Sequence, residues 1–159
     1  MKKIFLILGL SLYLFANQSD IDKVKETYAK YNDKQLVNFI VNATNTTAGT
    51  KIDDFTIING AFSEFKNNKY IIGLNYEINK NKLISLMKTY KKDFKLTDKF
   101  KKRMSLQLKK DLISNVCRTA ENRAILDRGI NIKLIYTLDK KEPLTEFILK
   151  ESDCLKILN

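Results

Sequence analysis

Histidine and tryptophan are absent from this 159-residue chain, and proline occurs only once, at Pro143. Without histidine the chain lacks the commonest general base, the usual Ser-His and Cys-His catalytic pairs and the ligands of most zinc sites. Dense acidic clusters are missing as well, so hydrolytic and metal-dependent chemistry have no visible apparatus. We therefore predict no catalytic residue, no metal site and no cofactor.

Cysteine is scarce too, with only Cys117 and Cys154. If the protein is exported, an even cysteine count favours a disulfide. The bond would close a segment of 38 residues, from 117 to 154 inclusive, and stabilise the fold by about 4 kcal/mol. The alternative is a catalytic dithiol, but redox pairs usually lie close together in sequence. We therefore predict a structural disulfide.

Long apolar runs are limited to one, Ile4–Phe15, which follows Lys2 and Lys3. A positive start, a short apolar run and a small residue at Ala16 are typical of a secretory signal peptide. The run is too short for a comfortable membrane span. We predict that residues 1–16 are cleaved; an uncleaved anchor is the alternative. Since no cysteine lies near this cleavage point, we expect no lipid-modified N-terminal cysteine, and a periplasmic or secreted protein.

The rest of the chain shows alternating and helical apolar spacings. These spacings predict helices at residues 20–31, 34–43, 83–90, 98–118 and 121–129, and strands at residues 52–62, 70–78, 130–138 and 144–151. Because helices and strands come in runs, we predict an α+β fold. Its mainly antiparallel sheet should have about four strands, in two hairpins, packed against helices. No linker suggests a second domain, so residues 17–159 should form one.

Single residues refine this outline. Asp33 and Thr97 are predicted to cap the helices that follow them. Gly60 should bend the first strand, and Gly129 suits the left-handed position at a helix end. Tyrosines at strand spacing are expected to pack in the sheet rather than to serve as acids. They are Tyr70, Tyr76 and Tyr136.

The predicted long helix, residues 98–118, has one apolar face. Its members recur every four residues, which indicates a helix packed on the core. They are Phe100, Met104, Leu108, Leu112 and Val116, widened by Ile113 and Cys117. The lysines of this helix fall off that stripe and are expected to face water. They are Lys101, Lys102, Lys109 and Lys110.

Positive charge is concentrated around this helix. The formal net charge is +11, and removal of Lys2 and Lys3 would leave +9. Residues 88–110 alone contain 10 basic and 2 acidic residues, a net +8. This clustering predicts a docking surface for an anionic partner, either an acidic protein or an anionic membrane or envelope surface. The candidate residues are Lys91, Lys92, Lys95, Lys101, Lys102, Lys109 and Lys110.

The cluster also fits two other interpretations. The first is a lysine-rich, solvated helix face that binds nothing. The second is nucleic-acid binding, which fits less well because Arg103 is the only arginine in residues 88–110. An exported protein would also meet DNA only during uptake or transfer.

The end of the chain resembles a layout found in small exported bacterial proteins of unsettled activity. The shared features are a helix ending in Cys117, the spacing Arg123-x-x-Leu126-x-x-Gly129, a strand containing Tyr136, a polar turn and a final strand leading to Cys154. The preceding strands, with Thr56 and Tyr76, also fit, so the resemblance covers about two-thirds of the mature chain. It implies this fold and the disulfide, and no catalytic residue.

A looser similarity is to pilotins, the small periplasmic helpers of secretion systems, although the lipid-attachment cysteine of their lipoprotein members is missing. We therefore expect a non-enzymatic periplasmic or secreted binding or accessory module that serves an envelope or secretion assembly. The alternatives are an exported enzyme with a histidine-free site, or a secreted factor that acts on host membranes or proteins.

Overall fold

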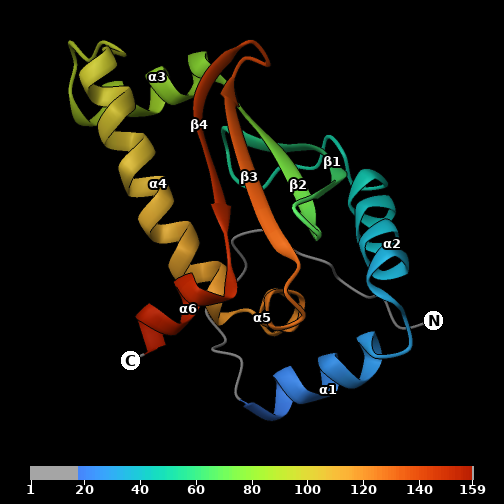
Figure 1. The fold of residues 1–159 in the computed structure, drawn as a ribbon. Helices are drawn as coiled ribbons and strands as arrows, with labels where there is room; N and C mark the ends of the chain where they lie inside the picture. Colours follow the sequence, from blue (N-terminus) through green and yellow to red (C-terminus); the bar gives the residue numbers. More distant parts are fainter. Residues whose placement is uncertain (1–17, 159) are drawn as a thin grey trace.

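A computed structural model describes residues 18–158, so the predicted signal peptide, residues 1–16, lies outside the described residues. The described chain contains six helices and one four-stranded sheet (Figure 1). The elements are α1 (Gln18–Tyr28), α2 (Asp33–Asn45), β1 (Thr56–Lys66), β2 (Lys69–Ile78), α3 (Lys80–Tyr90), α4 (Asp98–Arg118), α5 (Ala120–Asp127), β3 (Asn131–Leu138), β4 (Glu142–Leu149) and α6 (Glu151–Leu158). The predicted α+β class is confirmed.

The sheet has the strand order β1-β2-β3-β4. β1 pairs with β2, and β3 with β4, as the two expected antiparallel hairpins. The central pair, β2 and β3, is parallel and runs in register from Ile71 opposite Asn131 to Ile78 opposite Leu138. Two parallel neighbours need a long crossover connection. Here α3, α4 and α5 supply it, and this mixed topology was not predicted.

Alternate residues of the two central strands form the floor of the core. Those that face the helices are almost fully buried: Ile72, Leu74, Tyr76 and Ile78 in β2, and Ile132, Leu134, Tyr136 and Leu138 in β3. The rings of Tyr76 and Tyr136 stack with their centroids 4.7 Å apart. Burial raises the pKa of both phenols above the usual value, so both stay protonated at neutral pH. Their predicted packing role is confirmed.

Helices cover this face of the sheet. α2 lies beside β1, α4 beside β4, and α1 and α5 lie together beyond one end of the strands (Figure 1). The largest fully buried side chains of the helices are Leu36 and Ile40 in α2 and Ile125 and Leu126 in α5. α4 contributes Val116 and Cys117, while Met104, Leu108 and Leu112 of its stripe are only partly buried. The prediction that this helix faces the core is therefore confirmed, and its C-terminal end is the most deeply buried part.

The predicted disulfide between Cys117 and Cys154 is present. The two Cα atoms are 5.1 Å apart, and both residues are buried. The sequence predicted that Cys154 directly follows the last strand. In the structure it lies inside α6. This helix begins where the strand was expected to end, and Asp153 Oδ2 accepts a hydrogen bond from the Lys150 amide at its start. The bond therefore joins two helices, α4 and α6.

Arg128 fixes the corner between α1 and α2. Its guanidinium donates to the carbonyl oxygens of Tyr28 (2.7 Å) and Tyr31 (2.9 Å) and to Asp33 Oδ1 (2.6 and 3.0 Å). Asp33 is the first residue of α2 and not its cap, so this prediction is wrong. Asn32 is the cap: its side chain accepts from the Gln35 amide, and the Gln35 side chain accepts from the Asn32 amide.

The bend predicted at Gly60 is a β-bulge between Ile58 and Gly60. Gly60 has a φ of +116°, which strongly favours glycine. The Asn45 side chain holds the bulge because it donates to the Ala61 carbonyl (3.0 Å) and accepts from the Ala61 amide (2.7 Å). β1 begins at Thr56, later than predicted, because Asp53 Oδ1 accepts from the Phe55 and Thr56 amides and forms a turn there.

Candidate functional site

The predicted basic surface lies at the end of the molecule where α3 turns into α4 (Figure 1). Asn79 caps α3 through its side chain, and Thr97 caps α4 as predicted, with its hydroxyl accepting from the Phe100 amide at 3.3 Å. Between the helices, the Phe94 ring is buried and meets the Phe100 ring edge-on, with centroids 4.8 Å apart. These contacts give the lysine-rich loop a defined position.

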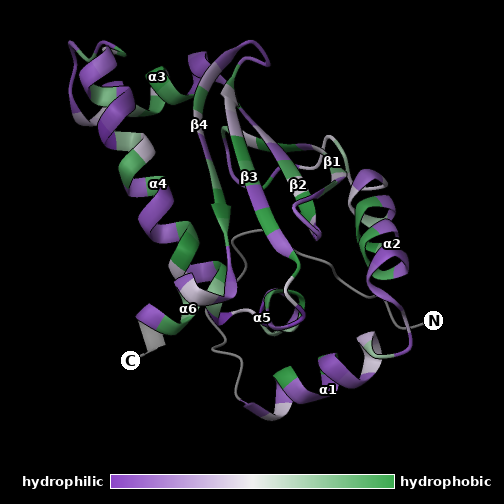
Figure 2. Cartoon of the chain, viewed as in Figure 1, coloured by the Kyte–Doolittle hydropathy of each residue, from purple (hydrophilic) through white to green (hydrophobic). Residues whose placement is uncertain are grey.

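Most basic residues of α4 lie on one side of the helix. Positions three and four apart share a face of a helix. Five of these basic residues and one leucine share such a face, and all six are exposed. We call them the outer face of α4: Lys99, Lys102, Arg103, Leu106, Lys109 and Lys110. In the described part of the chain, none of its lysines forms an ion pair. Figure 2 shows α4 as mainly hydrophilic, with short apolar bands.

Lys101 is the exception among the predicted binding lysines. Its side chain is only 23% exposed, and its ammonium group lies 2.6 Å from Glu142 Oε1 and 2.9 Å from Asp98 Oδ1. Hydrogen bonds to Glu142, and then to Asp98, raise the pKa of Lys101. The prediction that Lys101 faces water is therefore wrong, because this lysine ties α4 to β4.

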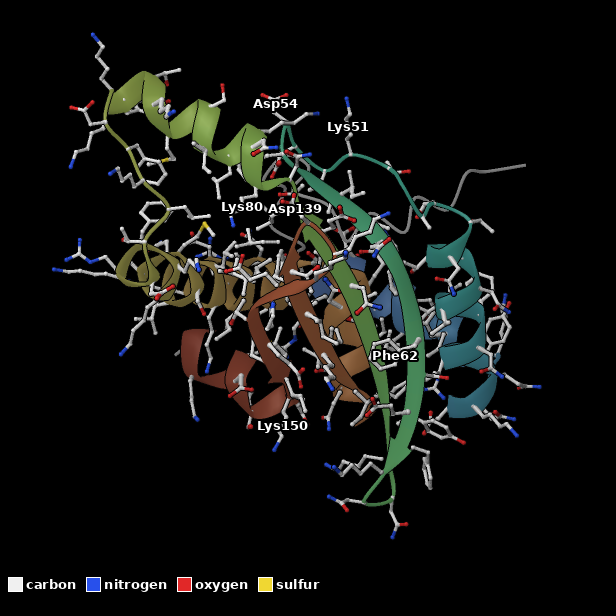
Figure 3. The ribbon with its side chains drawn as sticks, turned by 90° about the horizontal axis from the view of Figure 1, so that it is seen from above. Lys51, Asp54, Phe62, Lys80, Asp139 and Lys150 are labelled. Carbon is white, nitrogen blue, oxygen red and sulfur yellow. A yellow bond between two sulfur atoms is a disulfide. The ribbon has the colours of Figure 1, made fainter. Side chains whose placement is uncertain are left out.

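Glu142 accepts hydrogen bonds from lysines of two helices, α3 and α4. Besides Lys101, it accepts from Lys80 Nζ at 3.3 Å. The hydrogen bond from Lys101, and then that from Lys80, lower the pKa of Glu142. Nearby, where α3 begins, the Lys80 amide donates to Asp139 Oδ1 at 2.9 Å (Figure 3). These bonds fix the start of α3 and the first turns of α4 to the β3–β4 hairpin.

The remaining predicted lysines, Lys91, Lys92 and Lys95, are all exposed in the loop between α3 and α4. Just before them in the chain, α3 carries two exposed apolar side chains: Tyr90 is 80% exposed and Leu86 is 37% exposed. On α4, Leu106 is 63% exposed in the middle of the outer face. The structure therefore places apolar groups among the lysines.

These apolar groups were not predicted from the sequence. The four-residue spacing predicts one core stripe on α4, but Leu106 stands two positions from Met104 and cannot share that stripe. An apolar residue off the stripe was the signal that could have found it. Tyr90, at the end of α3, carried no comparable signal.

Lys133, on β3 of the sheet, is neutralised internally. Lys133 Nζ lies 3.0 Å from Glu146 Oε1, 3.9 Å from Glu64 Oε1 and 6.0 Å from the centroid of the Phe62 ring, which is labelled in Figure 3. The hydrogen bond to Glu146 is the main reason that the pKa of Lys133 is raised. The sheet surface around Lys133 therefore balances its own charge, which sets the outer face of α4 apart.

A small hollow of about 90 Å³ lies at the start of β1. It is far smaller than the roughly 300–1,000 Å³ of typical ligand pockets. Of its charged residues, Asp53 is used as a turn acceptor, and Glu77 Oε2 lies 4.0 Å from Lys140 Nζ. Its lining residues are Lys51, Asp53, Asp54, Phe55, Ile57, Glu77, Asn79 and Lys82. Asp53 therefore has a structural role in this turn.

Two further properties of residues 18–158 bear on the site. Within this range, no group of three histidine, cysteine, aspartate or glutamate side chains is placed to hold a metal ion. None of the helices in the same range is both long and apolar enough to cross a membrane.

Comparisons with known proteins show the fold. No described protein family and no curated protein matches the sequence. Among solved structures, a Pseudomonas aeruginosa protein assigned as secreted is similar with a TM-score of 0.53 and 11% identity, covering 87% of this chain and 99% of that one.

Two pilotins of type II secretion systems have similar structures. EpsS from Vibrio vulnificus gives a TM-score of 0.50 and 11% identity over 87% of this chain and 97% of its own. AspS from Vibrio cholerae gives 0.51 and 14% identity over 84% of this chain and 98% of its own. The three similarities span nearly the whole of each solved chain, so the fold is shared as a unit.

Proposed function

We propose that this protein is an exported, non-enzymatic accessory module of a bacterial envelope or secretion assembly, and that it docks onto an anionic partner through the outer face of α4. The observation that carries the proposal is that face itself. Lys102, Lys109 and Lys110 are exposed and free of ion pairs within the described residues. Lys133 on the sheet, by contrast, is paired with a carboxylate.

The exported location is part of the proposal. It is supported by the predicted signal peptide over residues 1–16 and by the buried disulfide between Cys117 and Cys154, because disulfides persist mainly in oxidising compartments. The accessory role is supported by the fold, which is similar to those of two secretion-system pilotins and of a protein assigned as secreted. A role in binding also fits a chain without histidine.

The test is complementation in the native bacterium. Deletion of the gene is expected to change the set of proteins exported to the medium, and the wild-type chain should restore it. A variant with Lys102, Lys109 and Lys110 changed to glutamate should fail to restore it, although it is exported and folded. No effect of the deletion on protein export would overturn the accessory role.

A matched control separates the surface from net charge. Lys23, Lys30 and Lys34 are exposed on or beside α1 and α2, and their change to glutamate removes the same charge. This control should restore export in full. Full function of the outer-face variant would overturn the proposed docking surface.

A further inference from the structure

The chemistry of the outer face and its loop narrows the choice of partner. Of the ten basic residues between 88 and 110, nine are lysines and one is Arg103. Interfaces between proteins are depleted in lysine and enriched in arginine, because the planar guanidinium binds carboxylates in fixed, bidentate geometry. A mobile ammonium group on a long stem suits a diffuse layer of negative charge better than it suits a shaped protein surface.

The exposed apolar side chains point the same way. Leu106 lies in the middle of the outer face with 63% of its surface exposed, and Tyr90 at the end of α3 is 80% exposed. Helices that lie on a bilayer surface combine lysines with exposed leucine and aromatic side chains. Tyrosine is enriched at that interface because its ring is apolar and its hydroxyl is polar.

The shape of the region is the third observation. The outer face is one side of a helix on the outside of the molecule, flanked by the loop with Lys91, Lys92 and Lys95 (Figure 1). The side of a helix is convex, so it offers no groove for a peptide, but it can lie along an extended surface. Lysine stems can cover Leu106 in water and spread their ammonium groups toward phosphates on contact.

From these observations we infer that the outer face of α4, with Tyr90 and the loop lysines, binds the surface of an anionic phospholipid bilayer. This inference rests on the proposed function and names the partner of the same site. Leu106 and Tyr90 enter the interfacial region, while the lysines contact the headgroup phosphates. The N-terminal half of α4 then lies against the membrane.

Binding of this kind is peripheral and reversible. Each lysine near an anionic membrane strengthens binding by about fivefold, and the effect is screened within a Debye length. Binding should therefore weaken steeply as salt is added. Leu106 adds apolar contact that salt does not remove.

The experiment is co-sedimentation of the exported, disulfide-bonded protein with vesicles. Mixed phosphatidylglycerol and phosphatidylcholine vesicles should bind it, and pure phosphatidylcholine vesicles should not. The variant with Lys102, Lys109 and Lys110 changed to glutamate should bind at least about tenfold more weakly. Leu106→Ser should lose severalfold in affinity and keep the salt dependence.

Two controls keep the test decisive. The variant with Lys23, Lys30 and Lys34 changed to glutamate carries the same net charge as the outer-face variant and should bind nearly as well as wild type. Equal losses in the two variants would mean that net charge, and not this face, attracts the protein, and would overturn the inference. The salt titration needs no variant, so it stays informative if a variant folds poorly.

The outcome also separates the inference from the proposed function. No binding to the mixed vesicles at low salt overturns the lipid partner. If the outer-face variant nevertheless fails in complementation while its control succeeds, the docking surface stands and its partner is an acidic protein. If the protein binds vesicles but the outer-face variant complements fully, the proposed docking role fails.

Discussion

The C-terminal half of α4 is built into the core, whereas its N-terminal half lies at the surface with one side open to solvent. Val116 and Cys117 are buried at the first end, and Cys117 is bonded to Cys154. At the other end Lys102 and Leu106 are exposed. The C-terminal half of α4 thus has a structural role, whereas its N-terminal half exposes side chains to solvent.

This contrast has a physical basis in where the helix is held. Cys117 is fixed covalently to α6, and Lys101 bridges to Glu142 on β4. The outer face of α4, by contrast, is exposed to solvent. A helix held in this way can tolerate many like charges on its free side, because packing and a disulfide supply the stability that like charges take away.

The largest expected effect on stability comes from removing the disulfide at the C-terminal end of α4. Changing Cys117 and Cys154 to serine should lower the free energy of unfolding by about 2–5 kcal/mol, because an unfolded chain without the bond has more conformational freedom. Urea unfolding monitored by circular dichroism measures this. The outer-face variant should keep the wild-type midpoint, and an unchanged midpoint in the cysteine variant would contradict the structural role of the bond.

The second effect concerns the corner held by Arg128. Arg128→Ala removes the donors to the Tyr28 and Tyr31 carbonyls and to Asp33. Hydrogen bonds to charged groups contribute about 1.5–3 kcal/mol when buried. Since Arg128 and Asp33 are partly exposed here, we expect a loss of about 1–3 kcal/mol in the free energy of unfolding, measured by urea titration.

The control for this corner is Lys34→Ala on α2, which is exposed. A surface substitution of this kind should change stability by no more than about 0.5 kcal/mol. Equal effects of Arg128→Ala and Lys34→Ala would show that the corner does not depend on the guanidinium.

The smallest effect tests the comparison inside α4 itself, with two neighbouring lysines. Lys101→Met should lower the urea midpoint, because it removes the partner of Glu142 and Asp98, whereas Lys102→Met should leave it almost unchanged. The pKa of Glu142 is lowered in the fold, mainly by Lys101. Its contribution is therefore present above the unfolded pKa of about 4.3 and is lost as pH falls through the folded pKa.

The difference between wild type and Lys101→Met should accordingly be full at neutral pH and shrink in more acidic solution. Urea titrations of both proteins at several pH values measure it. Matching midpoints for Lys101→Met and Lys102→Met at neutral pH would refute the distinction between the two lysines.

Local patterns in the sequence predicted much of this molecule. Alternating residues such as Tyr76 and Tyr136 located the central strands, and four-residue spacing located α4. The cysteine count and the export signal predicted the disulfide before its geometry was known. Each of these signals lies within one element or in the composition of the chain.

Contacts between distant residues could not be read in this way. Lys101 and Glu142 are 41 positions apart, and Arg128 is 100 positions from Tyr28. Periodicity shows which side of an element is apolar, but not which neighbour a charged side chain reaches. The parallel pairing of β2 with β3 depends in the same way on where three helices place the chain between them.

The most direct test of the contrast between the two ends is hydrogen–deuterium exchange of the wild-type protein with and without mixed phosphatidylglycerol and phosphatidylcholine vesicles. We predict slower exchange in peptides from residues 88–110 when the vesicles are present, with no change in peptides from residues 117–154. Pure phosphatidylcholine vesicles should change neither. Protection confined to residues 117–154, or absent from residues 88–110, would contradict the assignment of the N-terminal half of α4 as the membrane-binding part.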